Sequence, residues 1–186
     1  MIILQTSQEQ RDEARANSTK MGVLHNSFSK GKGNGPGNMG EIVVLKHVGG
    51  VRVGDKKFSH DIELPSGIRI DVKTTIAAAP PEDYYSARVY GSADDREKLC
   101  SKCDVYYFTR CNTQLTLVTI VGWLPAREFI DKAIFSPKGH VNPDDGKLSY
   151  SDEYTMLISD LIPPEVKITK KRLGLTGKQT SKTKPV

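Results

Sequence analysis

The stretch Phe58-Ser-His-Asp-Ile-Glu-Leu-Pro-Ser-Gly-Ile-Arg-Ile-Asp-Val-Lys-Thr74 decides the fold of this chain. Pro65-Ser-Gly67 near its middle is typical of a turn, and on both sides of it apolar and charged side chains alternate. Successive side chains on a strand point to opposite faces of a sheet. We therefore predict two strands joined by a turn centred on Ser66, which places Asp61 directly opposite Asp71.

Each of the two predicted strands has one apolar and one charged face. The apolar face holds the even-numbered positions Phe58, His60, Ile62, Leu64, Ile68, Ile70 and Val72. The charged face holds Asp61, Glu63, Arg69, Asp71 and Lys73. Two carboxylates directly opposite each other repel by about 0.5 kcal/mol in water, and by more where water is excluded. A divalent cation between them reverses that sign, and Mg²⁺ prefers such oxygen ligands. The alternative is a solvated charged face, on which Arg69 pairs with Glu63 and Lys73 forms an ordinary ion pair.

Glu41 is a third acidic residue that we expect near this hairpin. A helix is predicted over 39–48, and Glu41, Val44, Leu45 and Val48 share the face of it that is expected to cover the sheet. A carboxylate on that face is costly unless it is paired or bound to a metal ion. The alternative is a capping box, in which the Glu41 side chain reaches back to the backbone of Asn38.

These residues resemble the PD-(D/E)xK nuclease superfamily, which has the restriction-endonuclease-like fold and includes Holliday-junction resolvases and phage and repair nucleases. Asp61, nine intervening residues and then Asp71-Val-Lys73 match its motif, and Glu41 on an early helix is similar to its helix-borne glutamate. The chain departs from the pattern at His60, where the motif has proline. The resemblance covers roughly residues 38–125 and implies an α/β fold with a mixed β-sheet flanked by helices.

The resemblance also implies a chemistry, namely Mg²⁺-dependent hydrolysis of a phosphodiester, with Mn²⁺ as a substitute for Mg²⁺. By position, Asp61 and Asp71 would be carboxylate ligands of the metal ion and the Val72 carbonyl a third ligand. Lys73 would orient or deprotonate the attacking water, and Glu41 would bind a second metal ion or a metal-bound water. Metal ions lower the pKa of bound water and neutralise charge that builds up on the phosphate.

Composition indicates one domain and a polyanionic partner. The chain has 186 residues, 37% of them hydrophobic, and a net charge of +5. We expect a single nuclease-like domain over 1–166, with a flexible glycine-rich loop at 27–38 and a basic, disordered tail at 167–186. That tail has seven Lys and Arg and no acidic residue. Such an excess favours DNA as the partner. The candidate nucleic-acid-binding residues are Lys30, Lys32, Arg69, Arg88, Lys170, Lys171 and Arg172.

The expected compartment is the cytoplasm, or the host cytoplasm if the protein is viral. No apolar run approaches the length of a membrane span, the first residues do not form a signal peptide, and three cysteines do not suit a disulfide framework. We therefore expect no membrane association. A homodimer is consistent with the resemblance, because many enzymes of this fold act as dimers.

The leading hypothesis is therefore a metal-dependent DNA nuclease, and more specifically an endonuclease. The first alternative is a non-catalytic nucleic-acid-binding module whose acidic hairpin is structural. The second is a zinc-stabilised interaction protein with ligands among Cys100, Cys103, Cys111 and His140. The sequence has one pair at zinc-finger spacing, Cys100 and Cys103, and no second pair. The sequence leaves open whether the substrate is a duplex, a junction, a flap or a single strand.

Periodicity and turn residues predict a helix–strand order typical of a mixed α/β domain. The expected helices are 6–20 (opening with a capping box at Thr6 or Ser7), 39–48, 93–102 and 125–133. The expected strands are 51–53, 57–64, 68–76, 84–90, 105–110, 115–123 and 154–158.

Overall fold

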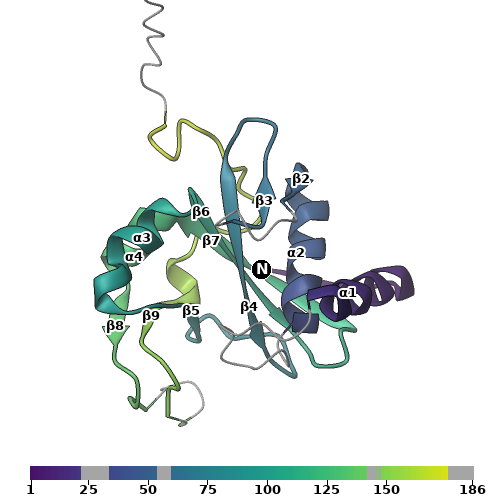
Figure 1. Cartoon of the computed structure of the whole chain (residues 1–186), viewed down its shortest axis with the longest axis horizontal. Coiled ribbons are helices and arrows are strands. Elements are labelled where there is room, and N and C mark those ends of the chain that lie inside the picture. Colours follow the sequence, from purple (N-terminus) through teal and green to yellow (C-terminus); the bar gives the residue numbers. More distant parts are fainter. Residues whose placement is uncertain (22–33, 54–59, 142–145, 147, 176–186) are drawn as a thin grey trace, which may run out of the picture.

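The computed structural model describes residues 1–21, 34–53, 60–141, 146 and 148–175, and it shows a mixed α/β fold (Figure 1). A larger sheet of six strands has the order β1-β7-β6-β4-β3-β2, and a smaller sheet of three strands has the order β5-β9-β8. The larger sheet consists of β1 (Ile2–Gln5), β2 (Val51–Arg52), β3 (Ile62–Glu63), β4 (Arg69–Ile76), β6 (Val105–Cys111) and β7 (Leu117–Pro125). The smaller sheet consists of β5 (Ser86–Tyr90), β8 (Ile134–Ser136) and β9 (Glu153–Leu157).

The larger sheet is mixed because one of its strand pairs is parallel. β4 and β6 run parallel, and every other named strand pair among the described residues is antiparallel. A parallel neighbour requires a crossover connection. Here the crossover from β4 to β6 contains β5, the 3₁₀ turn η1 (Ala93–Asp95) and α3 (Arg96–Ser101). The end of that crossover lies beside the beginning of β4, where the Asp104 N–H donates to the Arg69 carbonyl at 2.9 Å.

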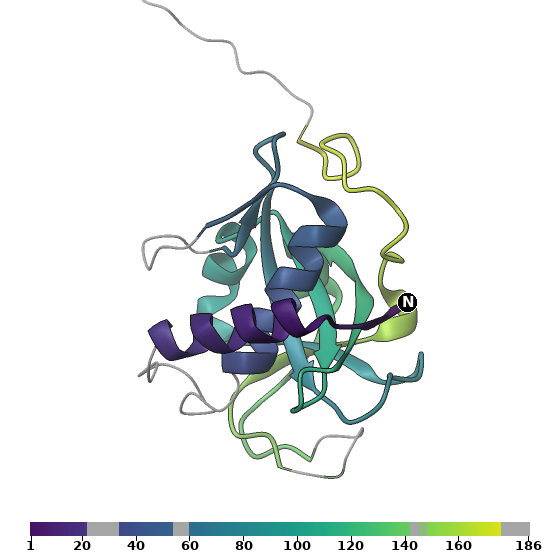
Figure 2. The same ribbon diagram turned by 90° about the vertical axis from the view of Figure 1, so that its right-hand side faces the viewer.

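The helices cover both faces of the larger sheet. They are α1 (Gln8–Met21), α2 (Asn34–Val48), α3 and α4 (Ala126–Lys132), and a second 3₁₀ turn, η2 (Ile158–Asp160), follows β9. α2 packs on β4, β6 and β7, and α1 packs on α2 (Figure 2). α3 and α4 pack together on the other face. Each face has its own hydrophobic core, with Tyr107 and Trp123 in the first and Tyr106, Phe108 and Phe129 in the second.

The predicted hairpin register is confirmed. Ile62 pairs with Ile70 and Glu63 with Arg69, so the two strands are aligned as a turn centred on Ser66 requires. Ile62, Ile68 and Ile70 are buried in the first core, as expected of the apolar face. β3 is much shorter than the predicted strand, because Asp61 forms a bend and residues 57–59 lie outside the described part of the chain.

The two N-terminal helices give one confirmation and one correction. α1 begins with the predicted capping box, in which the Gln10 amide N–H donates to Ser7 Oγ at 3.2 Å and the Ser7 N–H donates to Gln10 Oε1 at 2.9 Å. α2 begins at Asn34, so residues 34–38 are helix and not part of a glycine-rich loop, and Asn38 lies inside the helix, where it cannot be the cap for Glu41. The reason is packing, since Pro36 and Asn38 are buried and Asn38 Nδ2 donates to Ser18 Oγ of α1 at 3.2 Å.

Three further differences concern the ends of the chain and the smaller sheet. β1 was not predicted, and it pairs with β7 at the edge of the larger sheet. The predicted strand 84–90 becomes β5 but joins the smaller sheet. The packed part of the chain continues beyond 166, because Ile168 and Leu173 contact the first core and Trp123 Nε1 donates to the Val166 carbonyl at 3.0 Å. Residues 176–186 of the predicted tail lie outside the described residues.

No helix in the described part of the chain is long and apolar enough to cross a membrane.

Candidate active site

Asp71 lies at the centre of a cluster of charged side chains. It is in β4 on the face opposite to the first core, and only 4% of the residue is exposed. Lys73 Nζ lies 2.8 Å from Asp71 Oδ1, and Lys102 Nζ contacts the other carboxylate oxygen. Burial alone would raise the pKa of Asp71, but the two lysines outweigh it and hold this pKa below its ordinary value. Asp71 is therefore a buried carboxylate with two cationic partners.

Asp61 lies beside Asp71 across the hairpin, as predicted. It forms the bend before β3, and its Oδ2 accepts the Val72 amide N–H at 2.7 Å. Burial is the main cause that raises the pKa of Asp61 to about 8, and the charges of Asp71 and Glu41 add to it. The N–H and C=O of a strand residue point to the same neighbour. The Val72 carbonyl is therefore directed toward the side of β4 on which Asp61 lies.

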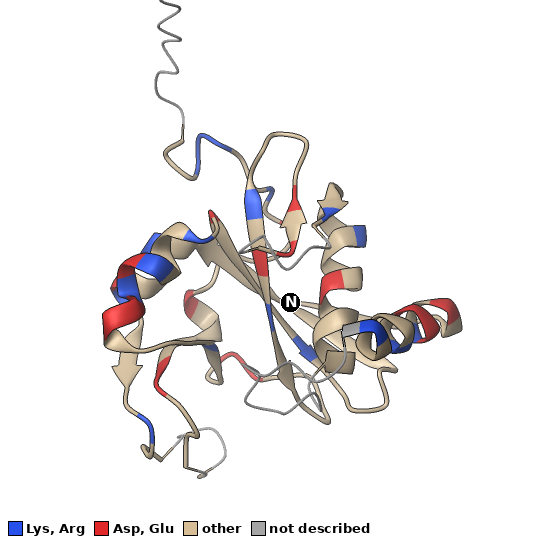
Figure 3. Ribbon diagram, in the orientation of Figure 1, with Lys and Arg blue, Asp and Glu red and all other residues tan. Residues whose placement is uncertain are grey.

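Glu41 comes from α2 and belongs to the same group of carboxylates. Its side chain is 18% exposed, and Arg52 of β2 donates to its Oε2 from Nε at 2.9 Å and from Nη2 at 2.5 Å. Burial raises the pKa of Glu41 more than Arg52 lowers it, and the charge of Asp71 raises it further. Arg52 also donates to Asn38 Oδ1. Figure 3 shows these charges as a red band on α2 and alternating blue and red bands on β4.

Gly40 explains how a helix residue can come so close to the sheet. A Cβ atom at this position would lie 2.6 Å from Thr109 Oγ1 and closer still to Thr74 Oγ1. These two hydroxyl groups are hydrogen-bonded to each other at 2.9 Å between β4 and β6. Only glycine fits at this distance. The next residue of α2, Glu41, is thereby held near β4.

The two lysines share the ring of Tyr106. Lys73 Nζ lies 5.8 Å and Lys102 Nζ 5.6 Å from its centroid, and the Tyr106 hydroxyl donates to the Leu99 carbonyl at 2.7 Å. Burial would lower the pKa of Lys73, but Asp71 and Asp61 outweigh it and raise this pKa. Burial and the nearby Lys73 together lower the pKa of Lys102. The Lys73 ammonium group therefore keeps its proton to a higher pH than the Lys102 ammonium group does.

Sequence reasoning found four members of the cluster and missed two. Glu41, Asp61, Asp71 and Lys73 were predicted, and their charges influence one another's pKa as proximity requires. Arg52 and Lys102 were not predicted as site residues. The lysine comes from the end of the crossover, and no spacing in the sequence reveals which residue of a crossover lies beside the strand it returns to. The Arg52–Glu41 pair depends in the same way on how β2 lies against α2.

The cluster offers oxygen atoms suited to a divalent cation. Two carboxylates and the Val72 carbonyl are hard ligands of the kind that Mg²⁺ takes, together with water and phosphate oxygens. A cation near Asp61 would also relieve the repulsion that raises its pKa. Within the described ranges, no three His, Cys, Asp or Glu side chains are grouped closely enough to enclose a metal ion. Because each oxygen of Asp71 already contacts a lysine, a metal ion on this carboxylate would have to displace one of the two.

The predicted nucleic-acid-binding residues do not gather at one place. Arg69 forms a two-pronged pair with Asp104, with Nη2 2.9 Å from Oδ1, in place of the expected Glu63. Arg88 lies in the smaller sheet and pairs with the buried Glu153. Lys30 and Lys32 lie outside the described residues. The remaining three, Lys170, Lys171 and Arg172, are exposed.

Those three cations lie on an ordered turn near the C-terminal end of the described chain. The Leu175 N–H donates to the Lys170 carbonyl at 2.9 Å and the Leu173 N–H to the Thr169 carbonyl at 3.2 Å. The turn lies at the same end of the molecule as the β3–β4 hairpin in both views (Figures 1 and 2). The turn therefore exposes three adjacent cations at that end of the molecule.

The cysteines do not form one site. Cys111 belongs to the first core, whereas Cys100 and Cys103 belong to the second, on the other face of the sheet. All three are free and buried, and burial raises the pKa of Cys103 and of Cys111 to about 12. A zinc site built from all three is therefore incompatible with this arrangement.

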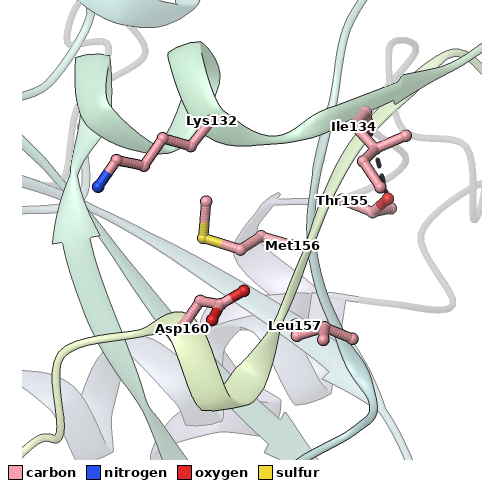
Figure 4. A pocket seen from close by; sticks show the side chains of 6 residues that line it. All are labelled: Lys132, Ile134, Thr155, Met156, Leu157 and Asp160. Atoms are coloured by element: carbon pink, nitrogen blue, oxygen red, sulfur yellow. Dashed lines mark hydrogen bonds between the residues drawn. The ribbon is translucent and has the colours of Figure 1, made fainter.

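A cavity of about 410 Å³ lies away from the cluster. Its lining residues come from α4, β8, β9 and η2, and they are Lys132, Ile134, Thr155, Met156, Leu157 and Asp160 (Figure 4). It contains none of the predicted site residues.

Comparison with known proteins found neither a protein-family model nor a curated protein that matches this chain.

Proposed function

We propose that this protein is a Mg²⁺-dependent nuclease with a restriction-endonuclease-like fold that hydrolyses phosphodiester bonds of DNA, and that it acts as an endonuclease. The observation that supports this best is the placement of Asp61 beside Asp71, where burial raises the pKa of Asp61 to about 8 and the charges of Asp71 and Glu41 add to that rise. Such perturbed pKa values cluster at functional sites. The mixed sheet with helices on both faces is also consistent with the fold that the motif implies.

Each residue of the cluster has a role in this chemistry. Asp61, Asp71 and the Val72 carbonyl would hold the metal ion, which when bound supplies an activated water and neutralises charge on the phosphate. The Lys73 ammonium lies where it can donate hydrogen bonds to a water molecule or a phosphate oxygen. Glu41 would hold a second metal ion or a metal-bound water, and Arg52 fixes its orientation.

DNA is proposed as the substrate because of the charge distribution. The net charge is +5, and the exposed turn at 170–172 carries three adjacent cations. Contacts of this kind bind phosphates without reading sequence and weaken as salt increases. Two copies of the chain would allow both strands of a duplex to be cut, which is the reason to propose a homodimer.

The test is nicking of supercoiled plasmid with Mg²⁺ or Mn²⁺, compared with the same reaction in EDTA. Wild type is expected to nick, whereas Asp71→Ala and Lys73→Ala are expected to lose activity by about 10²-fold or more. Asp94→Ala and Lys46→Ala are matched controls, because both side chains are exposed and lie outside the cluster. Equal behaviour of all five proteins would overturn the proposal.

A second function is supported by a different observation. Asp71 is already neutralised by Lys73 and Lys102, so the acidic hairpin could be a purely structural element of a nucleic-acid-binding module. That protein would shift DNA in a gel in EDTA and would not nick it when Mg²⁺ is added. The nicking assay therefore separates the two functions directly.

A further inference from the structure

Lys102 is a second cation on a carboxylate that already has one. It caps the C-terminus of α3, where its backbone N–H donates to the Lys98 carbonyl at 3.1 Å. From there its side chain reaches Asp71 of β4, and it remains 22% exposed. Lys73 alone would neutralise the single charge of Asp71. Lys102 is therefore in excess on this carboxylate.

The excess has an electrostatic cost. Both ammonium groups lie within 6 Å of the same ring centroid, 5.6 Å for Lys102 and 5.8 Å for Lys73, so two like charges are held close together. Their repulsion grows as water is excluded. Lys73 is attracted by both Asp71 and Asp61, whereas of these two only Asp71 is among the main attractions on Lys102. Lys102 is the cation that a stronger competitor displaces more easily.

We propose that Lys102 occupies the place of the metal ion on Asp71 in the metal-free protein and binds a phosphate of the substrate once the metal ion has displaced it. This inference rests on the proposed function. An ammonium group on a long, flexible side chain can change partners without movement of the backbone, and lysine binds phosphate as a point charge. No bond is made or broken in this exchange, and one cation replaces another.

The first test measures Mn²⁺ binding to the full chain without DNA, by calorimetry. Lys102→Gln removes the competing cation and is expected to bind Mn²⁺ about tenfold more tightly than wild type. Asp71 keeps Lys73 in this variant, so its carboxylate is not left unpaired. Lys98→Gln is the matched control, because this lysine lies one turn earlier and its side chain is 79% exposed. It is expected to bind Mn²⁺ like wild type.

A second variant gives the opposite expectation. Lys102→Arg places a guanidinium group on the Asp71 carboxylate. Arginine can bind a carboxylate through two hydrogen bonds at once, so it should be harder to displace than lysine. Mn²⁺ binding is therefore expected to weaken. A merely structural role of Lys102 would not shift Mn²⁺ affinity in opposite directions in the two variants. The proposed exchange would be overturned if both variants bound Mn²⁺ as tightly as wild type, or more weakly.

The third measurement is the rate of plasmid nicking at saturating Mg²⁺. Lys102→Gln is expected to lower kcat about 10²-fold, because a phosphate-binding cation is lost while the metal site is full. An unchanged kcat would overturn the phosphate-binding role. If wild type binds Mn²⁺ and nicks DNA but Lys102→Gln changes neither, this inference fails and the proposed function stands. If wild type does neither, the proposed function fails, and this inference fails with it.

Discussion

Two groups of buried charge in this molecule differ in how their charges are balanced. In the smaller sheet, the Glu153 side chain is 1% exposed, with Arg88 3.7 Å away at one oxygen and His140 3.5 Å away at the other. In the larger sheet, three carboxylates come from α2, from the bend before β3 and from β4. Burial raises the pKa of Asp61 and of Glu41 and neighbouring carboxylates add to it, whereas at Asp71 the two lysines outweigh burial and lower the pKa. The first group is one carboxylate, Glu153, with a basic side chain on either side. The second group brings three carboxylates from separate elements near one another.

The difference separates structural from functional burial of charge. Arg88 offers Glu153 a neutralising charge, although neither oxygen of this carboxylate has a hydrogen bond among the described residues. Removing one partner of such a buried pair is costly. Several acids brought together from separate elements repel, and this repulsion persists unless a cation is bound. Burial is the main cause of the raised pKa of Asp61, and the repulsion by Asp71 and Glu41 adds to it. The two groups should therefore respond differently to the same kind of substitution.

The largest difference is expected in catalysis. Asp71→Asn should lower Mg²⁺-dependent nicking by about 10³-fold or more, because a metal ligand is lost. Glu153→Gln should leave the nicking rate near that of wild type, because this residue lies in the other sheet. Initial rates at saturating Mg²⁺ measure both. Equal losses would mean that the two groups are not functionally distinct.

The next largest difference concerns stability. Glu153→Gln should lower the free energy of unfolding by about 3 kcal/mol, because the cation of Arg88 is left largely buried without its carboxylate. Urea denaturation measures this change, with Glu165→Gln as an exposed control. A loss no larger than that of the control would show that the Arg88–Glu153 pair does not contribute to stability.

The pH dependence of stability should sharpen the contrast. Burial and the neighbouring acids raise the pKa of Asp61 to about 8 in the folded protein, against an ordinary value of 3.8, so the folded state holds a proton that the unfolded state has released. Asp61 therefore lowers the free energy of unfolding progressively as pH rises from about 4 to about 8. Asp61→Asn removes this effect, and in EDTA at pH 8 it should be more stable than wild type by about 2 kcal/mol.

The difference between these two proteins should vanish near pH 4, where both carry a neutral side chain at this position. Asp94→Asn is the exposed control and should show no such trend. Thermal unfolding across this pH range measures it. A variant less stable than wild type at pH 8 would mean that Asp61 serves hydrogen bonding to Val72 and is not destabilised by its neighbours.

The smallest expected effect tests how Glu41 reaches the cluster. Gly40→Ala should cost about 1 to 2 kcal/mol, because its Cβ would collide with Thr74 and Thr109 and push α2 away from β4. Gly37→Ala, in the same helix with nothing within 4 Å of the added Cβ, should be neutral or stabilise by about 0.5 kcal/mol. Equal effects in urea denaturation would show that the close approach at Gly40 does not position α2.

The sequence was most informative where local rules determine structure. The turn at Pro65-Ser-Gly67 and strict alternation determine the hairpin register, so Asp61 and Asp71 could be placed opposite each other before any coordinates. The capping box at Ser7 and Gln10 is equally local. In both cases the partners are few residues apart and the residue types allow one geometry.

Features that depend on distant segments were not predictable in the same way. The glycines at 35 and 37 predicted a loop by composition, but both lie in α2. Gly40, in the predicted helix, allows α2 to approach Thr74 and Thr109, which are remote in sequence. Lys102 reaches Asp71 only because β4 and β6 are parallel neighbours. Long-range packing decides both, and a single sequence carries no signal for it.

The most direct test is a crystal of the protein soaked in Mn²⁺ and measured for anomalous scattering. We expect a Mn²⁺ peak between the carboxylates of Asp61 and Asp71, about 2.1 Å from their oxygens, with Lys102 moved off Asp71. A map with no peak there, and with Lys73 and Lys102 both still on Asp71, would contradict the claim that these acids converge to hold a cation.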